Sequence, residues 1–262
     1  MDFHSSVVTL TFGDAAENHV GMEMLGVRGA AGSGFTVAEL EAVAHAHGAG
    51  AELIPLPCPD ATKEAAAVLV IRGALSPALH AAMFAEQAAL EHDKKAFMYG
   101  RVVNKKARWN LCFDDVAHDP DYAAGKGRVV AWDDIPVTRT FTADWPSRFG
   151  AKAAGLKGEG NYYYNLKSCG IGWHGDTERR KVIAIRLGAA MPIHYQWYNK
   201  SAPVGPVITI PLNGGDMYLM SEKAVGADWK SPSKWTLRHA AGVHAGAVAA
   251  AGAGAAAGAG AH

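Results

Sequence analysis

The sequence predicts a mainly β protein with flanking helices, an α+β fold whose core is a double-stranded β-helix, or jelly roll. From residue 161 onward, short apolar stretches recur at close and even spacing with Gly and Pro between them, which is typical of antiparallel strands in a sandwich or barrel. A helical pattern precedes these stretches. A jelly roll needs about eight strands, and strand candidates occur at residues 161–166, 170–174, 182–187, 192–198, 206–212, 216–220 and 235–240.

Residues 1–62 are predicted to form a small α+β extension. Residues 7–12 are rich in Val and Thr, and residues 52–56 form a second short apolar stretch, so both favour strands. Between them, Thr36 is a candidate helix N-cap, and Glu39 completes a capping box three residues later. No chemistry is assigned to this extension.

Residues 63–242 are predicted to form the main domain. It opens with an apolar, β-branched strand at 66–72, followed by a helix at 75–91 whose apolar residues recur at helical spacing. Residues 94–130 are predicted to be rich in loops and carry a basic cluster. The last stretch, 243–262, is nearly all Ala, Gly and Val, which predicts a low-complexity tail, disordered or weakly helical.

Composition limits the classes of protein. The 25 basic and 25 acidic residues cancel, so net charge neither demands nor excludes nucleic acid. Three scattered cysteines, Cys58, Cys112 and Cys169, disfavour a disulfide framework or a zinc site and suit a reducing compartment. No signal-peptide pattern or membrane-spanning run is recognised. We therefore expect an intracellular protein, nuclear or cytoplasmic, with no membrane association and no obligate protein partner.

The segment around residue 174 carries the strongest chemical signal. His174 and Asp176 lie two positions apart at the end of a predicted strand, and side chains two apart in an extended chain project to the same face. One imidazole nitrogen and one carboxylate oxygen can therefore reach the same ion. Two histidines and one carboxylate on one face of a metal, with the other face open, form the usual site of non-haem Fe(II) oxygenases.

A third ligand is expected from a late strand. In a jelly roll the strand with His174 and Asp176 can lie beside one from the opposite half of the sequence, and His239 is the natural candidate there. His194, on an earlier strand, is its main rival, and His244 lies in the tail. The sequence thus predicts His174, Asp176 and His239 as metal ligands at the catalytic centre.

Iron held by three residues keeps three open positions. A 2-oxo acid can fill two of them through its keto oxygen and adjacent carboxylate, and dioxygen can fill the third. Decarboxylation of the 2-oxo acid then supplies an oxidant able to take hydrogen from a nearby C–H bond. The protein would position the target and exclude water.

Several ordered motifs accompany the His-x-Asp pair. They are Asn161-x-Tyr163, His174-x-Asp176-x-Glu178, a strand ending in Leu187-Gly188, a Leu-x-x-Gly-Asp pattern ending at Asp216, and a late strand that contains Arg238. Together they resemble the AlkB-like branch of the 2-oxoglutarate and Fe(II)-dependent dioxygenases, over roughly residues 66–242.

The resemblance implies Fe(II) as the metal and 2-oxoglutarate as the cosubstrate. In that family the Asn-x-Tyr side chains hold 2-oxoglutarate and the closing strand carries an arginine that binds it, which implies Asn161, Tyr163 and Arg238 here. The trailing acid helps to read the target base, which implies that Glu178 faces the substrate.

The sequence departs from the family at two points. The family's second histidine comes sooner after the Gly-Asp strand, and no Lys or Arg follows His239, where the family usually has its arginine. A bidentate Arg–carboxylate pair is the usual way to hold a carboxylate. Arg186 and Lys234 are therefore alternatives to Arg238 as the cation for the far carboxylate of the cosubstrate.

A basic and aromatic cluster spans residues 94–109. Cations for phosphates together with aromatic faces for stacking suit a flipped base or a single strand, although a solvated loop is the simpler alternative. The segment 97–101 resembles the one that covers the nucleotide in the AlkB-like family. We therefore predict four substrate contacts in this cluster: Tyr99, Arg101, Lys105 and Arg108.

The leading hypothesis is a dioxygenase that oxidises an alkyl group on a nucleobase of DNA or RNA, with nucleic acid as its substrate. A second hypothesis is the same chemistry on a protein side chain or a small molecule. A third is a non-catalytic relative that binds nucleic acid or a partner, which the missing arginine motivates.

Overall fold

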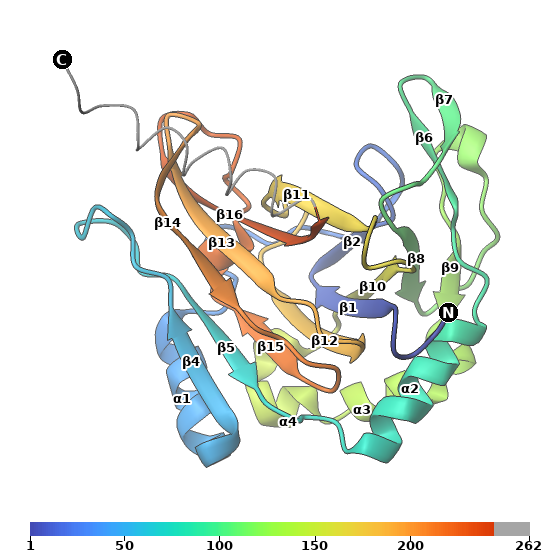
Figure 1. The fold of residues 1–262 in the computed structure, drawn as a ribbon, viewed down its shortest axis with the longest axis horizontal. Helices are drawn as coiled ribbons and strands as arrows, with labels where there is room; N and C mark the ends of the chain where they lie inside the picture. The colour runs from blue at the N-terminus through green and yellow to red at the C-terminus, as the bar shows by residue number, and fades with distance from the viewer. Residues whose placement is uncertain (244–262) are drawn as a thin grey trace.

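Two β-sheets form the centre of the protein in a computed structural model that describes residues 1–243 (Figure 1). The predicted tail lies outside the described residues, apart from Val243. Neighbouring strands of the large sheet run antiparallel except for its last pair. Its strand order is β4 (Ala51–Pro55), β5 (Ala67–Ile71), β15 (Met217–Met220), β12 (Val182–Gly188), β1 (Val7–Gly13), β10 (Lys157–Tyr163), β8 (Trp109–Asp114) and β9 (Val129–Ala131).

The small sheet packs against one face of the large sheet. Its antiparallel strands follow the order β11 (Gly170–His174), β16 (Trp235–Gly242), β13 (Ile193–Asn199) and β14 (Ala202–Ile210). Tyr195, Trp197 and Leu237 from the small sheet share one buried apolar cluster with Val182 and Tyr218 from the large sheet. Burial of these side chains between the sheets supplies the main driving force for their association.

Helices cover the other face of the large sheet (Figure 1). They are α1 (Val37–His47), α2 (Pro77–Ala89), α3 (Pro136–Thr142) and α4 (Trp145–Phe149). Because side chains alternate along a strand, Val8, Leu10 and Phe12 of β1 pack in one cluster with Leu40 and Trp145 from the helices. The intervening residues of β1 face the small sheet. Among residues 1–243, no helix has the length and apolar character needed to cross a membrane.

Short elements complete the described chain. One hairpin joins β2 (Ala15–Glu17) to β3 (Met24–Gly26), and a second joins β6 (Lys95–Met98) to β7 (Arg101–Asn104). A one-turn helix, α5 (Glu222–Val225), follows β15. The hairpin β6–β7 projects away from the two sheets (Figure 1).

The prediction of a mainly β, α+β protein is confirmed, and both predicted helices occur as α1 and α2. The capping box is also confirmed. Glu39 donates its backbone N–H to Thr36 Oγ1 at 3.1 Å, and Thr36 donates its backbone N–H to Glu39 Oε2 at 2.7 Å. These contacts satisfy amide groups that the first turn of α1 leaves without helical partners.

The segment predicted as an amino-terminal extension belongs to the large sheet. β1 lies between β12 and β10, and β4 pairs with β5 across the predicted boundary between residues 62 and 63. Every residue of β1 except Thr11 is buried. A strand that is buried in this way needs neighbours on both edges and cover on both faces.

The region 94–130, predicted to be rich in loops, contains β6, β7, β8 and β9. β8 was missed because Asn110 and Asp114 interrupt its apolar residues. In the structure the Asn110 side chain is buried and hydrogen-bonded, since it accepts from Lys105 at 2.9 Å and donates to Asn161 at 2.9 Å. A buried polar group that is satisfied in this way is compatible with an interior strand.

Candidate metal centre

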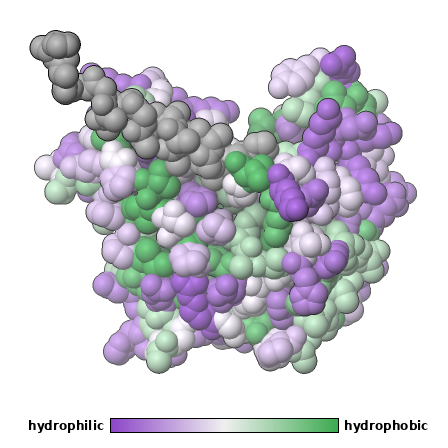
Figure 2. All heavy atoms as spheres, in the orientation of Figure 1, coloured by the Kyte–Doolittle hydropathy of each residue, from purple (hydrophilic) through white to green (hydrophobic). Residues whose placement is uncertain are grey.

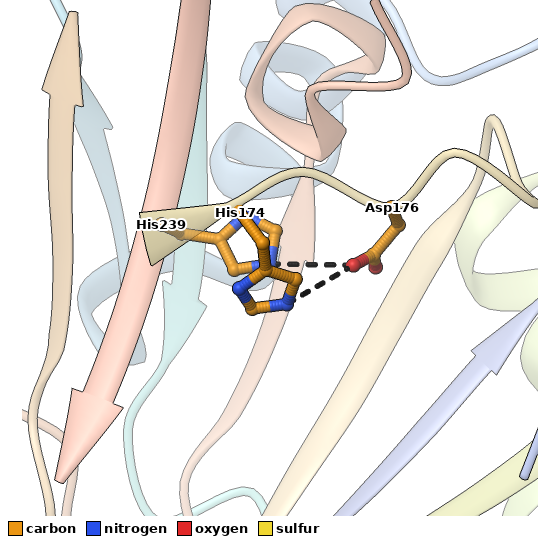
Figure 3. A group of neighbouring side chains, drawn as sticks. All are labelled: His174, Asp176 and His239. Atoms are coloured by element: carbon orange, nitrogen blue, oxygen red, sulfur yellow. Dashed lines mark ion pairs between the residues drawn. The ribbon is translucent and has the colours of Figure 1, made fainter. Parts of the chain in front are cut away.

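Two histidines meet on neighbouring strands of the small sheet. β11 and β16 run antiparallel, and His174 lies directly opposite His239 in their register. A register irregularity between Ile171 and His174 precedes this pair. The two imidazole rings lie 4.4 Å apart between centroids and point toward the same space (Figure 3). Strand pairing therefore joins two residues that are far apart in the sequence.

The carboxylate comes from the loop that follows β11. Asp176 donates its backbone N–H to the carbonyl of Val225 at 3.0 Å, which fixes the start of this loop. A Cβ atom on Gly175 would lie 2.1 Å from the backbone oxygen of Gly226, so a larger residue would collide with the backbone there. The middle residue of the His-x-Asp motif is thus a glycine because the loop passes against Gly226.

Asp176 completes a three-residue cluster with the histidines (Figure 3). Its Oδ1 lies 3.5 Å from His174 Nε2 and 3.4 Å from His239 Nε2. The ligand atoms of the three residues all lie within 4.8 Å of one another. Such a cluster can bind a metal ion through two nitrogens and one oxygen.

The protonation states agree with metal binding. His174 donates Nδ1–H to the carbonyl of Gly172 at 2.8 Å, so its Nε2 lone pair faces the cluster. Burial lowers the pKa of His174 to about 3, and His239 adds to this effect, which keeps the ring neutral. Burial would raise the pKa of Asp176, but His239 and Arg179 outweigh it and hold that pKa well below its usual range. His174 therefore presents a lone pair and Asp176 a negative charge to the space that the His239 ring also faces, and two imidazoles with one carboxylate are a donor set that fits a divalent cation.

His194, the main rival to His239, points away from the cluster. His194 stands opposite Ala240 in the register of β13 and β16, whereas its neighbour Tyr195 stands opposite His239. Since side chains alternate across a strand, His194 points to the other face of the small sheet, where its Nδ1 lies 3.0 Å from Thr209 Oγ1. His244 lies outside the described residues.

A cavity of about 900 Å³ surrounds the cluster, and residues of both sheets line it. Asn161 and Tyr163, predicted to hold the cosubstrate, both line this cavity from β10. Two of the predicted substrate contacts, Glu178 and Arg108, also line it, from loops outside β10. A cavity of this volume accommodates a small-molecule ligand. The remaining predicted substrate contacts do not line it.

A row of polar side chains crosses the large sheet beneath the cavity. Asn161, Thr9 and Arg186 are cross-strand neighbours on β10, β1 and β12, and all three line the cavity. Arg186 is 1% exposed and donates Nη1–H to the Thr9 hydroxyl. Its Nε has no hydrogen-bond partner among residues 1–243. A buried guanidinium with a spare donor beside a cavity is suited to bind an anion.

Asn161 is held by its neighbours. Its Oδ1 accepts from Arg108 Nε at 2.5 Å and from Asn110 Nδ2 at 2.9 Å, and its Nδ2 donates to Glu159 Oε1 at 2.9 Å. Tyr163 lies two residues further along the same face of β10, and burial raises its pKa. Both side chains are thus fixed before any ligand arrives.

Arg238, predicted to bind the cosubstrate, lies outside the set of cavity-lining residues. It comes directly before His239 on β16, and because side chains alternate along a strand, its side chain points to the opposite face. Its guanidinium stacks on Tyr198 at 3.8 Å and on Trp229 at 5.1 Å from the ring centroids, and donates to the Trp229 carbonyl at 3.4 Å. Of the three cations considered for the far carboxylate of the cosubstrate, Arg238, Arg186 and Lys234, Arg186 is the one that lines the cavity.

The predicted substrate contacts occupy different environments. Burial raises the pKa of Glu178 to about 7. Lys105 is mostly buried and donates to Asn18 Oδ1 at 2.5 Å and to Asn110, and burial lowers its pKa to about 8. Tyr99, at the tip of the β6–β7 hairpin, is 89% exposed, and Arg101 beside it is also exposed. The surface is hollowed beside this hairpin (Figure 2).

The cavity lining includes residues that sequence reasoning missed, among them Thr9, Arg179 and Trp229. Thr9 carries no signal in the sequence, because its role depends on the insertion of β1 between β12 and β10. Arg179 directly follows the His-x-Asp-x-Glu motif, and this position was a signal that could have drawn attention to it.

Comparison with known proteins shows that the sequence is similar to a viral protein. No protein-family model matches the sequence. The uncharacterized protein R156 of Acanthamoeba polyphaga mimivirus is 44% identical to it over 244 residues, which cover 90% of this chain and 95% of that protein. At this identity and coverage, the chain belongs to the same family as the mimivirus protein R156.

Proposed function

We propose that the protein is an Fe(II)- and 2-oxoglutarate-dependent dioxygenase that oxidises an alkyl group on a nucleobase of DNA or RNA. The observation that carries this proposal is the convergence of two imidazoles and one carboxylate, His174, His239 and Asp176, at the wall of a large cavity. When bound, Fe(II), 2-oxoglutarate and dioxygen supply the oxidising chemistry. The protein's own residues bind and orient these groups and exclude water.

The strand arrangement supports a double-stranded β-helix as the core. Four strands of the large sheet, in the order β10, β1, β12 and β15, face the four strands of the small sheet. These two sets supply the roughly eight strands that a jelly roll needs. The amino-terminal strand β1 takes part in this core, so the segment that supplies Thr9 is an integral part of the proposed fold.

The row on the large sheet supports a 2-oxo acid as the cosubstrate. We propose that Arg186, assisted by Thr9 and Asn161, binds the far carboxylate, in place of Arg238. Arg186 lines the cavity, and its buried Nε has no partner among the described residues. The Nε of Arg238 is also unpartnered, but Arg238 does not line the cavity and its guanidinium stacks on two aromatic rings. A carboxylate would satisfy this donor and offset the buried positive charge.

Anaerobic Fe(II) titration followed by measurement of succinate formed from 2-oxoglutarate tests the proposed chemistry. The wild-type protein should bind one Fe(II) and form succinate. Arg186→Met should weaken binding of 2-oxoglutarate by at least about tenfold, because a charged hydrogen-bonded partner is lost. Arg238→Met is the matched control and should leave this affinity within about twofold. Equal losses in the two variants would contradict the choice of Arg186.

Two features support a nucleobase as the target. Glu178 and Arg108 line the cavity and offer hydrogen-bonding groups beside the metal cluster. Outside the cavity, Lys94 lies 4.6 Å above the Trp109 ring, and Trp109 stacks on Tyr164 at 4.2 Å. Cations that alternate with aromatic faces suit a strand of nucleic acid that delivers one base to a pocket.

The turn at the tip of the β6–β7 hairpin adds to this support. Tyr99 has φ 54°, in the left-handed region that non-glycine residues rarely adopt, and Gly100 follows with φ 74°. Such turns favour Asn and Gly, so the fold holds a large aromatic ring at an unfavourable position, 89% exposed. An outlier of this kind is typical of a functional contact.

Electrophoretic mobility shifts with single-stranded and duplex DNA and RNA test the substrate class. A nucleobase enzyme should prefer one of these forms and should lose affinity as salt rises, because cations release counterions from the phosphates. A protein that forms succinate but shows no salt-dependent affinity for any of them would instead favour a protein side chain or a small molecule as the target.

A further inference from the structure

We propose that Arg179 is a positioning residue of the metal centre: its guanidinium orients the Asp176 carboxylate and connects it to the wall that faces the cosubstrate. This inference rests on the proposed metal site. Nothing in the His-x-Asp motif itself requires a buried arginine three residues after the aspartate.

The two oxygens of the Asp176 carboxylate have different surroundings. Oδ1 faces the imidazole nitrogens of His174 and His239 at 3.5 and 3.4 Å. Oδ2 lies 3.7 Å from Arg179 Nε. The guanidinium therefore stands on the side of the carboxylate away from the histidines, where it favours one orientation of the group. A partner in this position aligns a metal-binding carboxylate before the ion arrives.

Arg179 is almost completely buried. Its side chain is 2% exposed, and it pairs with Glu159 through Nη2 and with Glu178 Oε1 at 2.7 Å. Together with Asp176, three carboxylates surround one guanidinium. When all three are ionised, this group carries more negative than positive charge, and a divalent ion at the adjacent cluster would offset the excess.

The ion pair between Arg179 and Glu159 connects the loop that carries Asp176 to the large sheet. Glu159 lies on β10, opposite Thr11 in the register, and its Oε1 accepts a hydrogen bond from Asn161 at 2.9 Å. A continuous path therefore runs from Asp176 through Arg179 and Glu159 to Asn161, in the row proposed to hold the 2-oxo acid. The orientation of the metal-binding carboxylate and that of the cosubstrate wall depend on the same ion pair.

Arg179 also has one hydrogen-bond donor without a partner among the described residues. Its Nη1 is buried and has no hydrogen-bond partner among residues 1–243, and the residue lines the cavity. Nη1 is therefore available to a ligand in the cavity.

Binding of Co(II), used as a spectroscopic probe, tests this role. Arg179→Met alone would leave the buried Glu159 carboxylate without its cationic partner. The variant of choice is therefore the double substitution Arg179→Met with Glu159→Gln, which removes both charges and keeps the acceptor for Asn161. We expect its Co(II) affinity to fall by about 10–100-fold and its visible absorption bands to shift, because the ligand geometry relaxes. Arg179→Lys should give a smaller change in the same direction, since it keeps the charge but not the planar fork.

Arg180→Met is the matched control, because Arg180 is adjacent in sequence but pairs with Glu222 at 3.6 Å. Its Co(II) affinity and spectrum should match those of the wild type. Circular dichroism and thermal unfolding without metal verify that each variant folds. Unchanged affinity and spectrum in the folded double variant, or equal changes in Arg180→Met, would overturn the role of Arg179. Failure of the wild-type protein to bind Co(II) would instead overturn the metal site and, with it, this inference.

Discussion

The metal centre and the β6–β7 hairpin differ in how the fold holds their charged and aromatic side chains. Arg179 and Arg186 at the candidate metal centre are 2% and 1% exposed, and each contacts a residue on a strand distant in sequence, Glu159 for Arg179 and Thr9 for Arg186. Tyr99 at the hairpin tip is 89% exposed, and the hairpin strands pair with each other in a sheet of their own. Buried contacts hold the side chains of the candidate centre in place, as the proposed catalysis would require, whereas the exposed hairpin has few contacts that restrain Tyr99.

This difference predicts where substitutions act. Changes at the centre should alter metal binding, cosubstrate binding and stability together, because the groups there are buried and mutually hydrogen-bonded. Changes at the hairpin should alter affinity for a macromolecule and leave the fold intact.

Removal of the metal-binding carboxylate should have the largest effect. Asp176→Ala should abolish Fe(II) and Co(II) binding and all succinate formation, because a ligand and the negative charge of the site are both lost. Asp60→Ala, which changes a loop carboxylate paired with Lys63, is the control and should bind metal like the wild type. Metal titration by absorption spectroscopy measures the outcome. Retention of tight binding in Asp176→Ala would show that the ion lies elsewhere.

The next test compares the stability of the two regions. Leu10 is fully buried on β1 at the middle of the large sheet, and Leu10→Ala should lower the free energy of unfolding by about 2–5 kcal/mol. Val102 on β7 is 42% exposed, and Val102→Ala should change it by less than about 0.5 kcal/mol. Urea denaturation followed by circular dichroism measures both. Similar losses in the two variants would remove the proposed distinction between a rigid centre and a peripheral hairpin.

A smaller effect is expected at the hairpin tip. Tyr99→Ala should weaken binding to nucleic acid by about 1–3 kcal/mol if the ring stacks on a base. Arg101→Ala should reduce the slope of log affinity against log salt by about one. Fluorescence anisotropy at several salt concentrations measures both quantities. Val116→Ala, another exposed position at 76%, is the control. If Tyr99→Ala binds as well as this control, the hairpin is not part of the substrate surface.

The smallest effect concerns Lys105, which links the base of the hairpin to the buried network. Burial lowers its pKa from 10.5 to about 8 in the folded protein. Between pH 8 and about 9.5, the folded protein has released this proton while the unfolded chain retains it, so stability should rise with pH. Lys105→Met should lose this rise. Denaturation curves at half-unit pH steps test it, and an identical pH profile in the variant would contradict the assigned pKa.

Local patterns predicted the elements that depend on neighbours in the sequence. The capping box of Thr36 and Glu39 forms as expected, because both partners lie within one helical turn. His174 and Asp176 do meet as the spacing predicted, but Asp176 reaches the histidine from the loop after β11 and not from the strand itself. By contrast, β8 was missed, since its buried Asn110 is satisfied by the side chains of Lys105, in the turn before β8, and of Asn161, on a distant strand.

Periodicity and spacing along the chain were enough to predict the strand-rich α+β character of this protein and its His-x-Asp pair. The folded structure was needed to show that His239 rather than His194 faces that pair, that Arg186 rather than Arg238 reaches the cavity, and that Arg179 lies beside Asp176. These choices depend on strand register and on the position of β1 within the large sheet. A shift of one residue in register turns a side chain to the opposite face, so spacing along the chain cannot determine which distant residues meet.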